Sequence, residues 1–219
     1  HGVEAGSYGF RPGRGCKAAL RDVQQALALG DTHVVDADLK SYFDTIPHDA
    51  LHARLHERIK DGSVLKLIGQ FLEQEVVSDT ARWRPETGTP QGAVLSPLLS
   101  NVYLHPLDVH MREAGHRMVR YADDFVVLCK TVEEAQNALE RIRVWVEAAG
   151  LSLHPEKTRI AHLTEAGGHF DFLGYRFQHH PVKGHGRTIR PKKLKAIRAQ
   201  VKALTPRMNG QSTATLVNR

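Results

Sequence analysis

The sequence predicts an α+β fold of the split βαβ, or ferredoxin-like, type. Short apolar segments bounded by turn residues, such as THVVDADL, are typical of strands. Segments with apolar residues three and four positions apart, such as EEAQNALERIRVWVEA, are typical of helices. Leaving aside inserted helices, the segments follow the order strand, helix, strand, strand, helix, strand. This order is the one that the ferredoxin-like arrangement requires.

The first part of the chain is expected to contain three helices and one strand. A Gly-, Pro- and Arg-rich loop, GSYGFRPGRG, leads into the first helix. Either His48 or Asp49 could cap the helix that follows the SYFDTIP turn. In order, we expect a helix over residues 17–29, a strand over 32–39, and helices over 49–59 and 63–74.

The middle of the chain is expected to contain a helix and a strand hairpin. After the loop ETGTPQGAVLSP, Pro97 suits the first turn of a helix over 98–111, and Pro106 should kink or split that helix. The segment RMVRYADDFVVLC, residues 117–129, then predicts two short strands around a tight turn.

The last part is expected to contain two helices and further strands. Thr131 as N-cap, Glu134 three residues later and Gly150 at the end delimit one helix. Strands are predicted in KTRIAHL and HFDFLGYRFQ, and a basic helix in RPKKLKAIRAQVKAL.

The composition indicates a globular protein of 219 residues, 41% hydrophobic and 25% charged, long enough to bury a core. No apolar run reaches the roughly 18 residues of a membrane span, and the N-terminus does not resemble a signal peptide. Two cysteines are too few for a disulfide framework. We expect a piece of a longer cytoplasmic protein without a membrane partner.

Charge is distributed unevenly along the chain. After Asp171 there is no acidic residue, whereas eleven Lys and Arg residues follow. The first 171 residues hold 19 Lys and Arg against 24 Asp and Glu, a net charge of −5. An acidic body joined to a basic tail favours a cation site beside an arm that binds a polyanion, over a merely solvated basic helix.

Four aspartates are candidates for that cation site. Asp36 and Asp38 lie on one face of the strand over 32–39, at i and i+2. The ferredoxin-like topology places the end of that strand beside the turn of the central hairpin, which brings Asp38 next to Asp123. Asp38, Asp123 and Asp124 would then converge, and such a cluster requires a positive partner.

Oxygen-only ligands suit Mg²⁺ or Mn²⁺, and polymerases use two such ions about 3.5–4 Å apart to activate a 3′-hydroxyl. A lone pair of adjacent aspartates is more typical of an ordinary hairpin turn. The apolar runs that flank the pair, together with Asp38, favour the metal site.

Six segments occur in the order and approximate spacing of the blocks of reverse transcriptases, and they most resemble the group II intron-encoded and related bacterial enzymes. They extend from about Tyr8 into the last helix. The segments are FRPGRG, DADLKSYFDTI, GTPQGAVLSPLLSNVYL, YADD, LHPEKT and FLGYRF.

The resemblance implies a right-hand polymerase palm over residues 31–178 with inserted helices. A remnant of the fingers would occupy 1–30, and a linker with the start of a basic, α-helical thumb would occupy 179–219. The enzymes it resembles carry fingers segments before the FRPG block that hold the triphosphate, and they are not found in this sequence. The fragment is therefore expected to be limited in activity by itself.

The resemblance also implies a catalytic group. Asp38, Asp123 and Asp124 match the triad that binds two Mg²⁺, or Mn²⁺ as a substitute, with Asp36 secondary. Lys157 matches a lysine beside the departing pyrophosphate, where it would donate a proton or stabilise charge. Without the resemblance, a single surface lysine would indicate no functional role.

A nucleotide-binding group follows in the same way. Phe43 matches the bulky residue that excludes a 2′-hydroxyl and so selects deoxynucleotides, although a core Phe beside a turn is the alternative. Gln91 and Gly92 match residues that line the nascent base pair, with an ordinary turn as the alternative. The full implied set is Leu39, Tyr42, Phe43, Gln91 and Gly92.

A third group is implied to contact primer and template. Arg11 and Arg14 match a loop at the template backbone, with a solvated loop equally open. FLGY matches the primer grip, and the basic helix matches the start of the thumb, which follows a duplex by its phosphates. The set is Arg11, Arg14, Phe172, Leu173, Gly174, Tyr175, Lys192, Lys193 and Lys195.

The expected partners are an RNA template, a DNA or RNA primer, dNTPs and possibly intron RNA. Two competing functions stay open: a non-catalytic, maturase-like RNA-binding module and an RNA-dependent RNA polymerase. The intact triad argues against the first, and Phe43 with YADD against the second. The enzyme could equally belong to a CRISPR-associated, retron or defence system.

Histidines offer a weaker metal hypothesis. His48, His52 and His56 fall on one helix face at i, i+4 and i+8, but no Cys, Asp or Glu completes a zinc set, so a solvated face is favoured. His179, His180 and His185 are expected in a basic loop.

Overall fold

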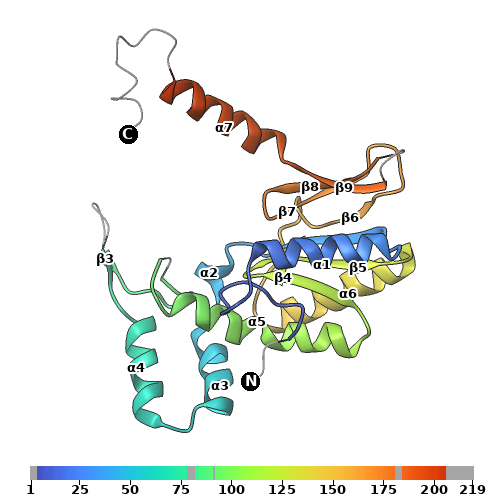
Figure 1. The fold of residues 1–219 in the computed structure, drawn as a ribbon. Helices are drawn as coiled ribbons and strands as arrows, with labels where there is room; N and C mark the ends of the chain where they lie inside the picture. The colour runs from blue at the N-terminus through green and yellow to red at the C-terminus, as the bar shows by residue number, and fades with distance from the viewer. Residues whose placement is uncertain (1–3, 78–81, 91, 181–183, 206–219) are drawn as a thin grey trace.

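The computed structural model describes residues 4–77, 82–90, 92–180 and 184–205, and its centre is a four-stranded antiparallel sheet (Figure 1). The strand order β4-β5-β1-β6 is that of the split βαβ arrangement, so the predicted fold class is confirmed. The strands are β1 His33–Asp38, β4 Arg117–Tyr121, β5 Asp124–Cys129 and β6 Arg159–His162.

Both faces of this sheet are covered, because alternate residues of each strand point to opposite sides. On one face, Val35 and Phe125 pack in a core with four helices: α3 His48–Arg58, α4 Gly62–Leu72, α5 Ser96–Glu113 and α6 Val132–Ala148. On the other face, Val34 and Val126 pack in a second core with α1 Cys16–Ala28 and the strands β7 His169–Phe172 and β8 Tyr175–His180. The site described below lies on this second face.

The helix ends follow the predictions in part. Thr131 caps α6 by accepting a hydrogen bond from the Glu134 backbone N–H at 3.2 Å, as predicted. Pro97 lies in the first turn of α5, and the helix continues through Pro106 without being split. The predicted cap of α3 is wrong: Pro47 occupies the cap position, and the His48 ring instead contacts the Gly88 carbonyl oxygen at 2.7 Å.

The short strands were only partly anticipated. The region around His179 and His185 is not a basic loop, because β8 continues to His180 and pairs with β9 Gly184–Ile189. The two imidazole rings face each other at 4.8 Å between centroids. A hairpin of β2 Val76–Val77 and β3 Arg82–Trp83 was not predicted, nor was the single turn α2 Tyr42–Thr45.

The helix α7 Pro191–Leu204 extends away from the body of the protein and buries none of its residues (Figure 1). Its base is held by Arg190, whose guanidinium lies 3.1 Å from the Asp171 carboxylate of β7. The same carboxylate accepts a 2.9 Å hydrogen bond from Arg176 of β8. No helix among the described residues has both the length and the apolar character that crossing a bilayer requires.

Candidate active site

The register of β1 and β5 creates the centre of the site. Asp38, the last residue of β1, lies directly opposite Asp124, the first residue of β5. Asp123 adjoins it in the tight turn that joins β4 to β5. The topology thus brings together the end of the first strand and the central hairpin turn, as predicted, with Asp124 as the direct cross-strand partner.

Lys157 supplies the positive charge nearest to this centre. Its ammonium nitrogen lies 2.8 Å from the Asp38 carboxylate. The loop that carries Lys157 is fixed by two backbone hydrogen bonds to the end of β1: Lys40 N–H to Ser152 O at 2.8 Å and His154 N–H to Asp38 O at 2.7 Å. The segment LHPEKT is therefore placed so that its lysine meets the end of the strand.

Burial makes Asp124 costly to ionise. Desolvation raises the pKa of Asp124 to about 7, partly offset by a hydrogen bond from the backbone N–H of Leu173 and reinforced by the charges of Asp36, Asp123 and Asp38. Burial likewise raises the pKa of Asp123 and brings that of Asp36 to about 6, although Arg159 opposes the latter shift. The site gathers more negative charge than its surroundings neutralise.

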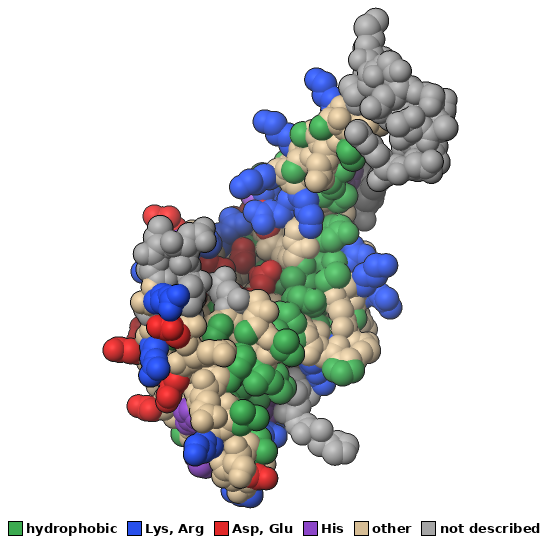
Figure 2. Space-filling model, turned by 90° about the vertical axis from the view of Figure 1, so that its left-hand side faces the viewer, with side chains coloured by type: hydrophobic (Ala, Val, Ile, Leu, Met, Phe, Trp, Pro, Cys, Tyr) green, Lys and Arg blue, Asp and Glu red, His purple; other side chains and the backbone are tan. Residues whose placement is uncertain are grey.

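This charge is visible on the surface. Figure 2 shows acidic side chains gathered in a hollow of the molecule, with Lys and Arg side chains bordering it on the side that leads to α7. The arrangement is one in which a cation and a polyanion could meet.

Backbone strain is concentrated around the same site. Among the described residues, four that are not glycine have positive φ angles between 48° and 60°. Each lies in one of the motif segments, and such conformations are most often found where function demands a special geometry. The four are Phe10 in FRPGRG, Ser41 in the turn after β1, Ala122 in YADD and Leu173 in FLGY.

The loop before α5 is joined to the turn that carries Phe43. The Thr89 N–H donates to the Phe43 carbonyl oxygen at 2.6 Å, and the Gly88 N–H donates to that of Ile46 at 2.7 Å. Gly88 has φ +86°, and a Cβ there would lie 2.6 Å from the Phe43 carbonyl oxygen. The Phe43 ring is half-buried and packs at 5.4 Å, edge to face, with the ring of Tyr42.

Several predicted site residues are core residues. Leu39, Tyr42 and Phe172 are each at most 4% exposed, and the Tyr42 hydroxyl donates to the Ser100 carbonyl oxygen at 2.9 Å. These three can offer a nucleotide or primer only their backbone. Gly92 is exposed in a turn, and Gln91 lies outside the described residues.

The basic residues divide into structural and exposed ones. The Arg11 guanidinium donates to the carbonyl oxygens of Glu4 and Ser7, at 2.8 and 2.7 Å, and thereby holds its own loop. Arg14 donates to the Ala5 carbonyl oxygen. Lys192, Lys193 and Lys195 are exposed at the base of α7, where the Lys193 side chain passes over Gly174 of FLGY.

The donor set fits a hard divalent cation in its chemistry, because Asp38, Asp123 and Asp124 offer carboxylate oxygens without competing sulfur or imidazole. As the side chains lie, however, no group of three or more His, Cys, Asp or Glu in the described part of the chain is arranged to hold a metal ion. The Asp38 carboxylate is instead paired with the Lys157 ammonium.

The sequence comparisons agree with this geometry. A family model described as reverse transcriptase (RNA-dependent DNA polymerase) matches residues 2–177. The chain belongs to the reverse transcriptase family. Reverse transcriptases use divalent metal ions, which accords with the carboxylate centre.

Relatives of this reverse transcriptase chain include several intron-encoded proteins. It is 28% identical to the group II intron-encoded protein LtrA of Lactococcus lactis, over 77% of this chain and 38% of that protein. It is 31% identical to protein YkfC of Escherichia coli, over 78% of this chain and 54% of that protein. The chain thus spans about half or less of the curated relatives described here.

Solved structures support the same fold. The apo telomerase of Candida tropicalis, truncated from its C-terminal domain, superposes with a TM-score of 0.61 at 14% identity, covering 79% of this chain and 39% of that one. At this identity the likeness concerns the fold alone. It is consistent with a reverse transcriptase palm.

The contact between Gly88 and the Phe43 backbone can be tested with a matched pair. Gly88→Ala should lower the free energy of unfolding by about 2 kcal/mol or more, because the new Cβ must displace backbone atoms as well as adopt a left-handed conformation. Gly92→Ala, at φ +85° with no atom within 4 Å, should cost only about 1 kcal/mol. Urea unfolding followed by circular dichroism measures both, and equal losses would contradict the proposed contact.

The raised pKa of Asp124 makes a prediction about stability. Between its unfolded value near 3.9 and its folded value of about 7, the folded state holds a proton that the unfolded state has released, so metal-free stability falls as pH rises. Asp124→Asn removes this cost and should stabilise the protein at pH 8 by on the order of 1–3 kcal/mol. The gain should shrink as pH falls through 7 and vanish near pH 4.

Urea titrations in EDTA at pH 4, 6 and 8 measure this difference, with the exposed Glu57→Gln as the neutralising control. If Asp124→Asn were less stable than the parent protein at pH 8, the prediction would be wrong, because the folded protein would then stabilise the ionised Asp124 carboxylate.

Proposed function

We propose that this chain is the palm of an RNA-directed DNA polymerase that extends a DNA or RNA primer with dNTPs on an RNA template. The observation that carries the proposal is the register that sets Asp38 opposite Asp124, with Asp123 in the adjoining turn. In the reaction, the primer 3′-oxygen bonds to the α-phosphorus of the dNTP, the bond to pyrophosphate breaks, and the 3′-hydroxyl loses its proton.

Asp38, Asp123 and Asp124 would hold two Mg²⁺, with Mn²⁺ as a substitute. Bound there, the ions would lower the pKa of the 3′-hydroxyl and stabilise the charge of the leaving pyrophosphate. The raised pKa values of Asp123 and Asp124 support this assignment, since an added cation offsets the cost of burying their charges.

Lys157 would act on the leaving group. Its side chain is 61% exposed, and so it can leave Asp38 and reach an arriving triphosphate. There its ammonium would donate a proton to the pyrophosphate or balance its charge. The same movement would free the Asp38 carboxylate for other ligands.

Primer and template would lie between the carboxylates and α7. Leu173 of the FLGY turn donates its N–H to Asp124, so a primer end held by this turn would be positioned directly against the catalytic group. The exposed Lys192, Lys193 and Lys195 would follow the duplex by its phosphates, and Arg11 and Arg14 would lie toward the template. Gln91 and Gly92 would line the nascent base pair.

For the biological setting we propose a group II intron-like mobile element in the bacterial cytoplasm, associated with the nucleoid when it acts on DNA. The relative named as a group II intron-encoded protein supports this setting and makes intron RNA a further candidate partner. A relative named as the retron Mx162 reverse transcriptase of Myxococcus xanthus, 26% identical over 73% of this chain, keeps a retron system open.

Primer extension on poly(rA)/oligo(dT) with Mg²⁺ tests the polymerase. The full-length gene product should incorporate dTTP more efficiently than the chain by itself, and Asp123→Asn in the full-length product should reduce kcat at least about 1,000-fold because a ligand is lost where charge develops in the transition state. Glu57→Gln, which neutralises an exposed carboxylate on α3, should leave the rate unchanged. Circular dichroism verifies the fold of each variant.

No synthesis by the full-length product with either metal ion, while RNA binding is retained, would overturn the polymerase in favour of a maturase-like binding module. Incorporation of NTPs in preference to dNTPs would favour an RNA polymerase.

Phe43 should set the preference for deoxynucleotides. Phe43→Ala would open space for a 2′-hydroxyl and should reduce the ratio of kcat/KM for dTTP over UTP at least about 10-fold. Phe71→Ala is the matched control, because Phe71 is also a half-buried ring packed against the same core but lies on α4. Steady-state extension with each nucleotide measures the ratio, and an unchanged ratio in Phe43→Ala would assign Phe43 to the core alone.

A further inference from the structure

Arg120 lies three residues before Asp123 and is fully buried, with 0% of its surface exposed. It belongs to β4 and points to the sheet face opposite the carboxylates, toward α5. An isolated guanidinium in such a place would be very unfavourable, because the charge loses its water. Its partners therefore decide what the residue does.

All five N–H donors of Arg120 are used. Nε and Nη2 donate to the two carboxylate oxygens of Asp108, at 2.7 and 2.5 Å. Nη1 donates to Asn101 Oδ1 at 3.0 Å and to the Ala122 carbonyl oxygen at 2.8 Å, and Nη2 donates to Ser7 Oγ at 3.0 Å. A guanidinium has five donors in a rigid plane, so this set fixes its orientation completely.

One of these acceptors lies in the turn of the active site. Ala122 precedes the aspartate pair and has φ +60°, a left-handed conformation that alanine adopts at a cost. The hydrogen bond from Arg120 to its carbonyl oxygen holds the peptide that enters Asp123. The turn is thus held from the α5 side by a guanidinium whose orientation is fixed.

The remaining acceptors bring in the N-terminal segment. The Arg120 backbone N–H donates to Gly6 O, and the Tyr8 N–H donates to Arg120 O, each at 2.8 Å. Asn101, which accepts from Arg120, donates through its own Nδ2 to the Gly9 carbonyl oxygen at 2.9 Å. Gly9 lies directly against the turn, since a Cβ there would approach the Ala122 nitrogen to 2.3 Å.

We propose that Arg120 is a positioning residue that sets the orientation of the turn bearing Asp123 and Asp124. Through Ala122 it fixes the turn, and through Asn101 and Ser7 it fixes the segment that packs behind the turn. Asp108 supplies the compensating charge and holds the plane of the guanidinium. The alternative is that Arg120 merely neutralises Asp108 inside the core.

Two variants separate these roles. Arg120→Lys retains the positive charge beside Asp108, but one ammonium cannot reach Asp108, Asn101 and Ala122 in the geometry of the planar fork. Arg120→Met/Asp108→Leu removes both charges together, which a core tolerates far better than the loss of one partner. In both variants the Ala122 carbonyl oxygen loses its guanidinium donor.

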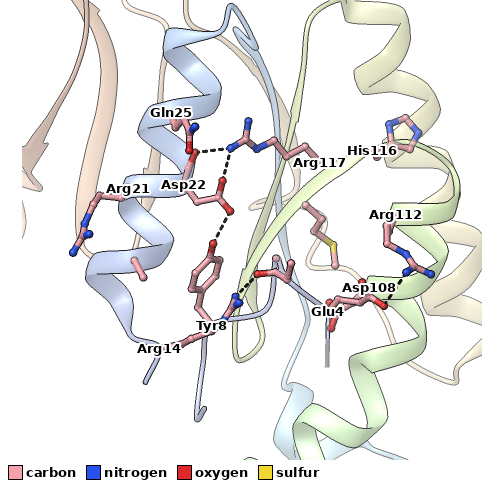
Figure 3. A pocket seen from close by; sticks show the side chains of 14 residues that line it. Glu4, Tyr8, Arg14, Arg21, Asp22, Gln25, Asp108, Arg112, His116 and Arg117 are labelled. Carbon is pink, nitrogen blue, oxygen red and sulfur yellow. Dashed lines mark hydrogen bonds and ion pairs between the residues drawn. The ribbon is translucent and has the colours of Figure 1, made fainter. Parts of the chain in front are cut away.

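The same strand offers a matched control. Arg117, three residues earlier, points to the opposite face and pairs with Asp22 of α1 at 2.5 Å. Figure 3 shows this pair on the α1 side of a cavity of about 620 Å³, with Asp108 on the α5 side. Arg117→Met/Asp22→Asn removes an arginine of the same strand and its carboxylate partner on α1, both of which line this cavity, without touching the turn.

Hydrogen exchange followed by mass spectrometry, on the chain alone, tests the proposal without relying on catalysis. The peptide covering residues 119–126 should exchange at least about 10-fold faster in both Arg120 variants, since the Ala122 carbonyl oxygen of the turn loses its fixed donor. The control pair should match the parent protein there. Turn exchange equal to that of the parent in a folded Arg120→Lys or double variant would overturn the proposal.

A kinetic measurement then tests the consequence, and this part rests on the proposed polymerase function. In single-nucleotide extension both variants should lose about 10- to 100-fold in kcat while KM for dTTP changes less than about threefold, because the ligands are misplaced but the nucleotide site is intact. Parent-like kcat in the folded double variant would overturn the positioning role. An inactive full-length parent protein would refute the polymerase proposal, and the exchange result would still decide the role of Arg120.

Discussion

The antiparallel register between β1 and β5 is the constraint on which the site depends. It places Asp38 opposite Asp124 and, two residues along, turns Asp36 toward the same face. Because side chains alternate across a sheet, a slip of one residue would turn these carboxylates into the core around α5 and α6 and expose Val35 in their place. The apolar residues on both faces of β1 therefore determine the position of its acidic ones.

That position is electrostatically unfavourable for the protein by itself. Burial raises the pKa values of Asp36 and Asp124 to about 6 and 7, and the charges of neighbouring carboxylates add to both shifts. Arg159 opposes the shift at Asp36 and the N–H of Leu173 opposes that at Asp124, while Lys157 pairs with Asp38. A site that gives up stability to concentrate charge is expected where a cation and a triphosphate are to be bound, and its cost is met by the two cores.

The sequence predicted the strand order, the meeting of Asp38 with the hairpin turn, and the helix cap at Thr131, because each follows from local periodicity or from a known motif. It could not predict β9, since GHGRTI has weak strand character and forms only by pairing with β8. The role of Arg120 was also missed. Two features of the sequence indicated it: Arg120 lies two positions from Met118 and so shares its buried face, and Asp108 lies on the buried side of α5. That these two side chains pair with each other can be known only from the tertiary structure.

The strained residues explain why these distant segments occur together in one chain. Phe10, Ala122 and Leu173 each adopt a left-handed conformation that their own sequences disfavour, so each must be held from outside. The Ala122 turn is held by Arg120 and by the backbone near Gly9, and the Leu173 turn is joined to Asp124. The motif segments therefore stabilise one another's unfavourable conformations. A change in any one of them should weaken the geometry of the others before it unfolds the core.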